Sequence, residues 1–133
     1  MAQDSILIVD DNPANTRLIS FLLTSRGYQV RTASNADETL NLIEEQLPRL
    51  ILMDIQLPGM DGLTLTRKLK ENARTRDVII VALSAYAMKG DEEKAIAAGC
   101  DGYITKPVDT RSFPGQIAEH LRAARTAERP FLT

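Results

Sequence analysis

The sequence predicts an α/β fold: a doubly wound, five-stranded parallel sheet of strand order 2-1-3-4-5, covered by five helices. Two observations predict it. Short apolar segments alternate with longer segments of helical period, which is typical of a parallel sheet with helices on both faces. The strands also differ in character. The first, third and fourth are almost continuously apolar, as central strands are, whereas the second alternates and the fifth is short, which indicates edge strands.

The first strand is predicted at residues 5–9, where four apolar residues follow Ser5. Asn12 is a good N-cap for the helix that follows, and Pro13 suits its first turn. Gly27 is expected to end this helix. Between these ends, apolar residues recur at helical spacing: Leu18, Phe21, Leu22 and Leu23.

Residues 28–33, in which polar or charged neighbours separate Tyr28, Val30 and Thr32, are predicted to form the second strand. The helix after it has an apolar stripe and is ended by Pro48. The stripe consists of Ala36, Leu40, Ile43 and Leu47. The third strand is predicted at residues 50–53, which are all apolar.

The second half of the chain continues the alternation. A short helix is expected to begin near Gly62, with Leu65 and Leu69 on one face. A helix over residues 88–98 is expected to end at Gly99. The fourth and fifth strands are predicted at residues 78–83 and 102–105. The last helix has a buried stripe of Phe113, Ile117 and Leu121.

The bulk composition indicates one globular domain, which we place at residues 1–125 with a flexible tail at 126–133. The net charge is −2, from 16 basic and 18 acidic residues, so no direct nucleic-acid binding is expected. The apolar runs are too short for a membrane span, and no basic-then-apolar leader precedes the first strand. Cys100 is the only cysteine, so an internal disulfide is excluded and a reducing cytoplasm is the expected location.

Polar side chains with complementary chemistry follow the strands that should border the ligand crevice. Asp10 and Asp11 follow the first strand, Asp54 the third, Ser84 the fourth and Lys106 the fifth. Because ligands of doubly wound sheets bind at the carboxyl ends of the strands, these groups are expected to converge.

Three close carboxylates favour a bound cation, because two like charges about 4 Å apart repel by roughly 4 kcal/mol at an effective dielectric near 20. Ligands that are all oxygen atoms suit Mg2+. Asp54 lies on a central strand and is the best-placed nucleophile, so an aspartyl phosphate is the expected product. Lys106 would offset charge on the phosphoryl oxygens, and Ser84 would donate a hydrogen bond to them.

Each of these residues also has a structural interpretation. Asp10, Asp11 and Asn12 could cap the helix that follows them, a role we expect for Asn12. Asp54 could be a turn acid, Ser84 could cap a turn, and Lys106 could be a solvated loop lysine. Only their joint placement at successive strand ends favours a functional site. His120 is expected on the exposed side of the last helix and Cys100 in the core, while Met60 and Met88 could contribute either to a partner surface or to packing.

At these residues the chain resembles the receiver domains of bacterial two-component response regulators. The resemblance covers residues from about 5 to 124 and implies the flavodoxin-like receiver fold. Its motifs are IVDDN at 8–12, LMDIQLPGMDG at 52–62, LSA at 83–85 and YITKP at 103–107. Residues 87–93, AMKGDEE, also resemble stand-alone cell-division regulators of the DivK kind, and a single-domain chemotaxis-regulator-like protein is the expected type.

The resemblance implies a role for each matching position. Asp54 resembles the phosphoacceptor. The implied Mg2+ ligands are Asp10, largely through water, Asp11 directly, and the backbone carbonyl of Gln56, together with Asp54. Lys106 resembles the lysine that contacts the phosphoryl group. The remaining implied roles are the switch hydroxyl, the switch aromatic residue and a cis proline: Ser84, Tyr103 and Pro107.

The resemblance further implies how such a protein works. A histidine kinase or a histidine phosphotransfer protein would donate the phosphoryl group, and a downstream protein partner would bind the face formed by the fourth helix, fifth strand and last helix. The protein would be no enzyme in the usual sense, since it would catalyse only its own phosphorylation and dephosphorylation. It would be a monomer or a phosphorylation-linked dimer.

Other interpretations stay open from the sequence. The chain could be the receiver portion of a larger response regulator or hybrid histidine kinase, although Met1 and the short tail favour a stand-alone protein. A Mg2+-dependent phosphatase with an aspartate nucleophile, of the haloacid-dehalogenase kind, would carry Asp-x-Asp after the first strand, where this chain has DDNP at residues 10–13. A nucleotide-binding protein would need glycines in the turn after that strand, and none is present.

Overall fold

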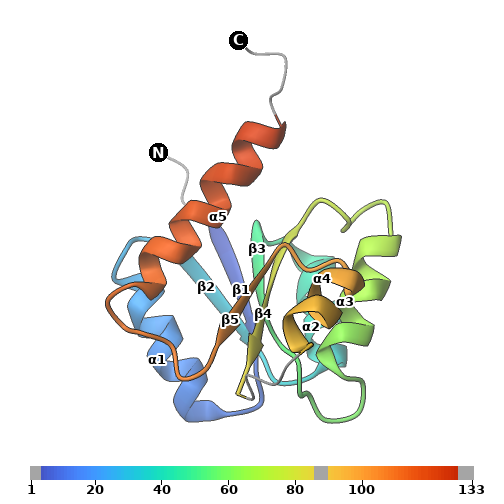
Figure 1. Ribbon diagram of the computed structural model, residues 1–133, viewed down its shortest axis with the longest axis horizontal. Coiled ribbons are helices and arrows are strands. Elements are labelled where there is room, and N and C mark those ends of the chain that lie inside the picture. The colour runs from blue at the N-terminus through green and yellow to red at the C-terminus, as the bar shows by residue number, and fades with distance from the viewer. Residues whose placement is uncertain (1–3, 86–89, 129–133) are drawn as a thin grey trace.

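The computed structural model describes residues 4–85 and 90–128, in which strands and helices alternate (Figure 1). The five strands are β1 (Ser5–Val9), β2 (Gln29–Ala33), β3 (Leu50–Asp54), β4 (Ile79–Ser84) and β5 (Gly102–Thr105). The helices of this part of the chain are α1 (Pro13–Thr24), α2 (Ala36–Glu45), α3 (Gly62–Glu71), α4 (Asp91–Ala98) and α5 (Phe113–Glu128).

The strands form one parallel sheet in the order β2-β1-β3-β4-β5, which confirms the predicted topology. All residues of β3 and β4 are buried, whereas the edge strands β2 and β5 are partly exposed, as their sequences predict. The register pairs Val9 with Met53, Asp54 with Leu83, and Ser84 with Thr105. The carboxyl ends of the strands therefore share one rim.

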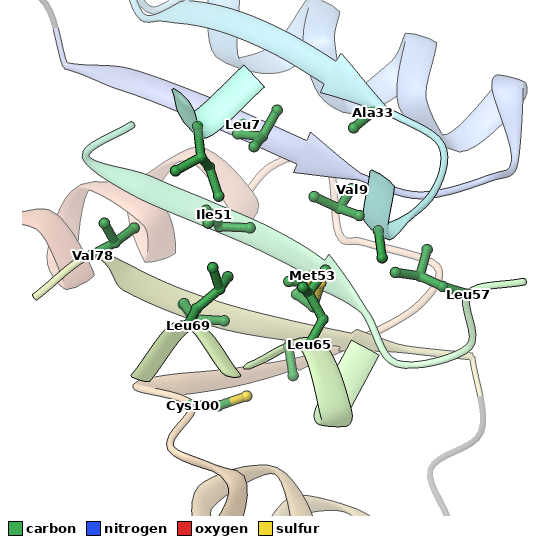
Figure 2. Packing of buried hydrophobic residues seen from close by; sticks show 14 of the residues in the cluster. Leu7, Val9, Ala33, Ile51, Met53, Leu57, Leu65, Leu69, Val78 and Cys100 are labelled. Atoms are coloured by element: carbon green, nitrogen blue, oxygen red, sulfur yellow. The ribbon is translucent and has the colours of Figure 1, made fainter. Parts of the chain in front are cut away.

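Helices cover both faces of the sheet, and each face has its own buried cluster. Alternate strand residues pack against α1 and α5 on one face, through side chains that include Ile19, Leu23 and Phe113. The opposite strand residues pack against α2, α3 and α4 (Figure 1). Figure 2 shows this second cluster, in which Leu65 and Leu69 of α3 lie against β3 and β4. The sheet is thus a layer packed between two layers of helices.

Side-chain caps stabilise the first turns of α1 and α3, which begin near the carboxyl ends of the strands. The side chain of Asn12 accepts hydrogen bonds from the N–H groups of Ala14 and Asn15, at 2.9 and 3.1 Å, so the predicted cap of α1 is confirmed. Asp61 caps α3 by accepting from the N–H of Thr64 at 2.8 Å. Both caps satisfy N–H groups that have no partner within the helix.

The apolar residues predicted to recur along α1 are only partly in the core: Leu23 is buried and Leu22 packs against the cluster. Ile19 and Leu23 face the sheet, whereas Leu18 is 40% exposed and Phe21 is 67% exposed. Apolar residues occur all round this helix, so periodicity alone could not select the buried face. The helix also ends at Thr24, and Gly27, with φ +92°, lies in the turn that leads to β2.

In α2 the predicted stripe is only partly correct. Ala36 and Ile43 are buried, but Leu40 and Leu47 are 40% and 39% exposed. The helix ends at Glu45, so Leu47 no longer follows the helical repeat that the prediction assumed. Pro48 is buried just before β3 begins.

The two C-terminal helices also differ from their predicted bounds. Met88, where the fourth helix was expected to begin, lies outside the described residues, and α4 is described from Asp91. Gly99 ends α4 with φ +108°, as predicted. Helix α5 continues to Glu128, so the predicted boundary between residues 125 and 126 falls within a helix.

His120 is half-buried, which corrects its predicted placement on the exposed side of α5. Its imidazole lies over Gly102 of β5, where an added Cβ would be 2.6 Å from Nε2. The glycine makes room for the ring, and this pairing between distant residues has no local sequence signal. Cys100 is buried as predicted, and burial raises the pKa of its thiol. Within the part of the chain described, the helices are too short or too polar to cross a bilayer.

Candidate functional site

The carboxyl ends of the strands bring together the acidic residues that the sequence placed there. Asp54 is the last residue of β3, and Asp10 and Asp11 directly follow β1, which pairs with β3. Each of these three residues offers a carboxylate oxygen, and the three oxygens lie within 4.8 Å of one another. Asp10 and Asp54 are buried, whereas Asp11 is exposed, so the acidic cluster opens to solvent on one side.

Asp10 is held in place by several donors. Its Oδ1 accepts a hydrogen bond from the N–H of Asn12 at 2.9 Å. Its Oδ2 lies 3.2 Å from Nζ of Lys106 and 3.4 Å from Nδ2 of Asn15. Sequence reasoning missed Asn15, although its place in the first turn of α1, close after Asp10, is a signal that could have indicated it. Both carboxylate oxygens of Asp10 are therefore engaged.

Asp54 has a different environment from Asp10. Its Oδ1 accepts a hydrogen bond from the N–H of Gln56 at 3.0 Å, and its Oδ2 lies 3.3 Å from Nζ of Lys106. Burial raises the pKa of Asp54 above its ordinary value, and the nearby Asp10 raises it further. The N–H of Gln56 and the charge of Lys106 act in the opposite direction. Asp54 is thus a buried carboxylate that neighbouring donors help to keep ionised.

Lys106 connects the two buried acids. Its side chain is only 11% exposed, and Nζ forms ion pairs with both Asp10 and Asp54. Its backbone N–H donates to the carbonyl of Ser84 at 2.7 Å, which fixes the end of β5 against β4. The peptide bond between Lys106 and Pro107 is cis, as the resemblance implied. The solvated-loop interpretation of Lys106 is therefore wrong.

Ser84 and Tyr103 lie on neighbouring strands beside the acids. Ser84 is buried at the end of β4, one residue beyond the partner of Asp54 in the sheet. Tyr103 is half-buried on β5 and packs against the cluster that includes Met53. Its hydroxyl oxygen is enclosed and finds no hydrogen-bond partner within the described residues. A buried hydroxyl without a partner is costly, which makes Tyr103 a candidate for a second side-chain position.

The donor set fits a hard divalent cation. The three acidic groups supply only oxygen atoms, as Mg2+ requires. When all three carboxylates are ionised, they and the ammonium of Lys106 have a net charge of −2, which a divalent cation would neutralise. A hollow of about 440 Å³ between α1 and the end of β2 is lined by Asp10, Asp11 and Arg17 among others, so it borders two of the three acids.

The known sequences that this chain resembles are response regulators. The family model described as the response regulator receiver domain matches residues 6–118. The chain is 42% identical over 117 residues to the polar-differentiation response regulator DivK of Brucella anthropi, covering 88% of this chain and 95% of that protein. It is 41% identical to the corresponding protein of Brucella ovis over the same length.

Solved structures show the same fold. A CheY-like response regulator receiver domain protein from Methanospirillum hungatei is 32% identical, with a TM-score of 0.86 over 95% of this chain and 99% of that one. The receiver domain of a sensor histidine kinase from Pseudomonas aeruginosa, solved with a magnesium ion coordinated in its active-site cleft, is 34% identical, with a TM-score of 0.82 over 91% and 99%. NtrX of Brucella abortus is 28% identical, with a TM-score of 0.89, over 96% of this chain but 29% of that one.

Proposed function

This chain belongs to the response regulator receiver domain family, and we propose that it accepts a phosphoryl group from a phosphohistidine onto Asp54. The observation that carries the proposal is the environment of Asp54. Its carboxylate is buried at the end of a central strand, within 4.8 Å of Asp10 and Asp11, and contacts the ammonium of Lys106. The phosphatase and nucleotide-binding interpretations have no comparable support.

Asp54 is a better acceptor than the other two acids. Asp10 has three donors, the N–H of Asn12 on one oxygen and Lys106 and Asn15 on the other, whereas Asp54 has one donor on each oxygen. Asp11 is exposed, and no hydrogen bond within the described residues orients its carboxylate. Asp54 combines burial with an orientation fixed by one backbone N–H and one ammonium, which is the preorganisation that phosphoryl transfer needs.

In the proposed reaction, a carboxylate oxygen of Asp54 attacks the phosphorus of a phosphoimidazole. An oxygen–phosphorus bond forms while the nitrogen–phosphorus bond breaks, and the bonding electron pair returns to the imidazole nitrogen, which takes up a proton. Lys106 lies where it can offset charge on the phosphoryl oxygens. A bound Mg2+ would supply further positive charge for the same oxygens.

We propose that Asp10, Asp11, Asp54 and the backbone carbonyl of Gln56 hold the Mg2+. The close approach of the three carboxylates supports the acidic part of this set. The N–H of Gln56 donates to Asp54, so the peptide chain turns back beside the acids at this residue. The similar receiver domain from Pseudomonas aeruginosa, which coordinates a magnesium ion in its active-site cleft, supports the choice of metal.

We further propose that Ser84 and Tyr103 report phosphorylation to the face formed by α4, β5 and α5. The enclosed, unpartnered hydroxyl of Tyr103 supports a side chain that changes position. A hollow of about 330 Å³ on this face is lined by residues of all three elements, including Glu92, Thr105 and Gln116. A downstream protein partner would bind there when phosphorylation shifts the population toward one arrangement.

The proposed setting is a stand-alone signalling protein of the cytoplasm, with a histidine kinase or histidine phosphotransfer protein as donor. The near-complete coverage of the DivK relatives supports the stand-alone form. The match to only part of NtrX keeps the receiver portion of a larger regulator as the alternative. In either form, its catalysis would be limited to its own phosphorylation and dephosphorylation.

The test is formation of an aspartyl phosphate. We expect incubation with Mg2+ and a small acyl phosphate donor to give one phosphoryl adduct that is stable in acid and labile in base. The adduct should be absent from Asp54→Asn and from chelated samples, and present in the control Asp61→Asn, which alters an exposed acid of the same loop. An adduct on Ser84 or His120, or none on the wild type, would refute the proposal.

A further inference from the structure

Gly62, the first residue of α3, lies directly against the backbone of the proposed acceptor. A Cβ added at Gly62 would overlap the carbonyl oxygen of Asp54 and lie 2.9 Å from its carbonyl carbon. The same Cβ would be 3.0 Å from Cα of Ile55. All three atoms belong to the main chain, which cannot move aside as a flexible side chain can. Gly62 therefore occupies a place where no other residue fits without a shift of α3 or of the end of β3.

The backbone conformation of Gly62 does not explain the glycine. Its φ is not positive, in contrast to Gly59, which has φ +79° and open space around it. Helix initiation does not explain it either, because Asp61 already caps α3 and glycine is among the poorest helix formers. The remaining reason is the close approach of two main-chain segments.

Three contacts hold the loop between Asp54 and Gly62 to the acceptor. The N–H of Gly62 donates to the carbonyl of Ile55 at 2.9 Å, which closes the loop. The N–H of Gln56 donates to Oδ1 of Asp54. The side chain of Leu57 is 8% exposed and belongs to the same buried cluster as Met53 of β3 and Leu65 of α3 (Figure 2). The first turn of α3 and the acceptor thus form one packed unit.

We propose that Gly62 is a positioning residue for the acceptor site. By allowing α3 to lie against the Asp54 carbonyl, it sets the Asp54 carboxylate and the Gln56 peptide relative to Asp10 and Asp11. This inference rests on the proposed function of Asp54. A displacement of about 1 Å at a reacting group can cost about a hundredfold in rate, so even a small shift of this unit has a measurable effect.

The test compares Gly62→Ala with Asp61→Ala. Both variants alter the start of α3, and loss of the Asp61 cap costs about 1 kcal/mol of stability without adding an atom near Asp54. We expect Gly62→Ala to weaken Mg2+ binding, measured by calorimetry, and to slow adduct formation at saturating Mg2+, each by at least about tenfold. Asp61→Ala should lower the melting temperature but leave both quantities within about twofold of wild type.

Equal Mg2+ affinity and rate in Gly62→Ala and wild type would overturn the positioning role. So would losses in Asp61→Ala as large as those in Gly62→Ala, since they would indicate a general loss of stability. A wild type that forms no adduct would instead refute the proposed function, while the Mg2+ affinities of the two variants would still decide the role of Gly62.

Hydrogen exchange of the wild type gives a second measurement, which does not depend on whether the Gly62→Ala variant folds. The N–H of Gly62 should exchange as slowly as that of Ile55, which donates to Leu83 in the sheet. Rapid exchange of Gly62 alone would show that α3 is not docked on the acceptor and would overturn the inference.

Discussion

Replacing Lys106 by methionine tests the electrostatic description of the site. The substitution keeps most of the length and apolar character of the side chain but removes the ammonium. Nζ lies 3.2 Å from Asp10 and 3.3 Å from Asp54, and the side chain is 11% exposed. In Lys106→Met the three neighbouring carboxylates lose the ammonium that pairs with two of them, Asp10 and Asp54.

The structure sets the size of the effect. An ion pair at 3.2 Å is worth about 5 kcal/mol at an effective dielectric of 20, before the cost of removing both charges from water. Breaking a buried ion pair by removing one partner typically costs about 3–5 kcal/mol. Because Asp11 is exposed and solvent reaches one side of the cluster, we expect Lys106→Met to lose about 3 kcal/mol of unfolding free energy near neutral pH without Mg2+.

The loss should depend on pH in a defined direction. Burial already raises the pKa of Asp54, and Lys106 lowers it, so removing Lys106 raises this pKa further. A carboxyl group with a raised folded-state pKa destabilises the fold when it is ionised. This penalty disappears as the pH falls through the folded-state pKa. The deficit of Lys106→Met should therefore be largest at neutral pH and shrink in weakly acidic solution, and added Mg2+ should also reduce it.

Urea unfolding followed by far-ultraviolet circular dichroism measures the deficit, since the chain has no tryptophan. The matched control is Lys70→Met. Lys70 also pairs with an aspartate, Asp101 at 3.0 Å, and is 19% exposed, but it bonds the carbonyls of Arg76 and Val78 rather than the acidic cluster. Its deficit should not respond to Mg2+. A Lys106→Met deficit below about 1 kcal/mol, or one unaffected by pH and Mg2+, would refute the reasoning.

Two further predictions concern stability. Asp54→Asn should raise the unfolding free energy at neutral pH without Mg2+, because a neutral amide avoids the penalty of an ionised carboxylate with a raised pKa and Lys106 keeps Asp10 as its partner. The gain should vanish in acid, where Asp54 is protonated, and urea unfolding that shows a loss at neutral pH would contradict it. Phe113→Ala should cost about 3–5 kcal/mol because Phe113 is fully buried, whereas Phe21→Ala should cost under about 0.5 kcal/mol because Phe21 is 67% exposed. If thermal melts show that the two variants lose the same stability, the observed exposure of Phe21 on α1 is contradicted.

The acidic site was predictable because its signals are local. A strand ends where its apolar run ends, so Asp10, Asp54 and Lys106 could be assigned to strand ends one by one. Parallel pairing then places those ends on one rim. The sequence did not predict Asn15 as a contact of Asp10, because a polar residue in a first helical turn has many possible partners.

By itself, the sequence determined the strand order, the cap at Asn12 and the acids at the strand ends. In each case the physical cause acts over a few residues: apolar character, capping or the end of a strand. Only the tertiary structure decided which side of α1 is buried, how His120 fits over Gly102 and why residue 62 is glycine. Those features depend on segments far apart in the chain or on the distance between two main-chain segments, and no local pattern encodes that distance.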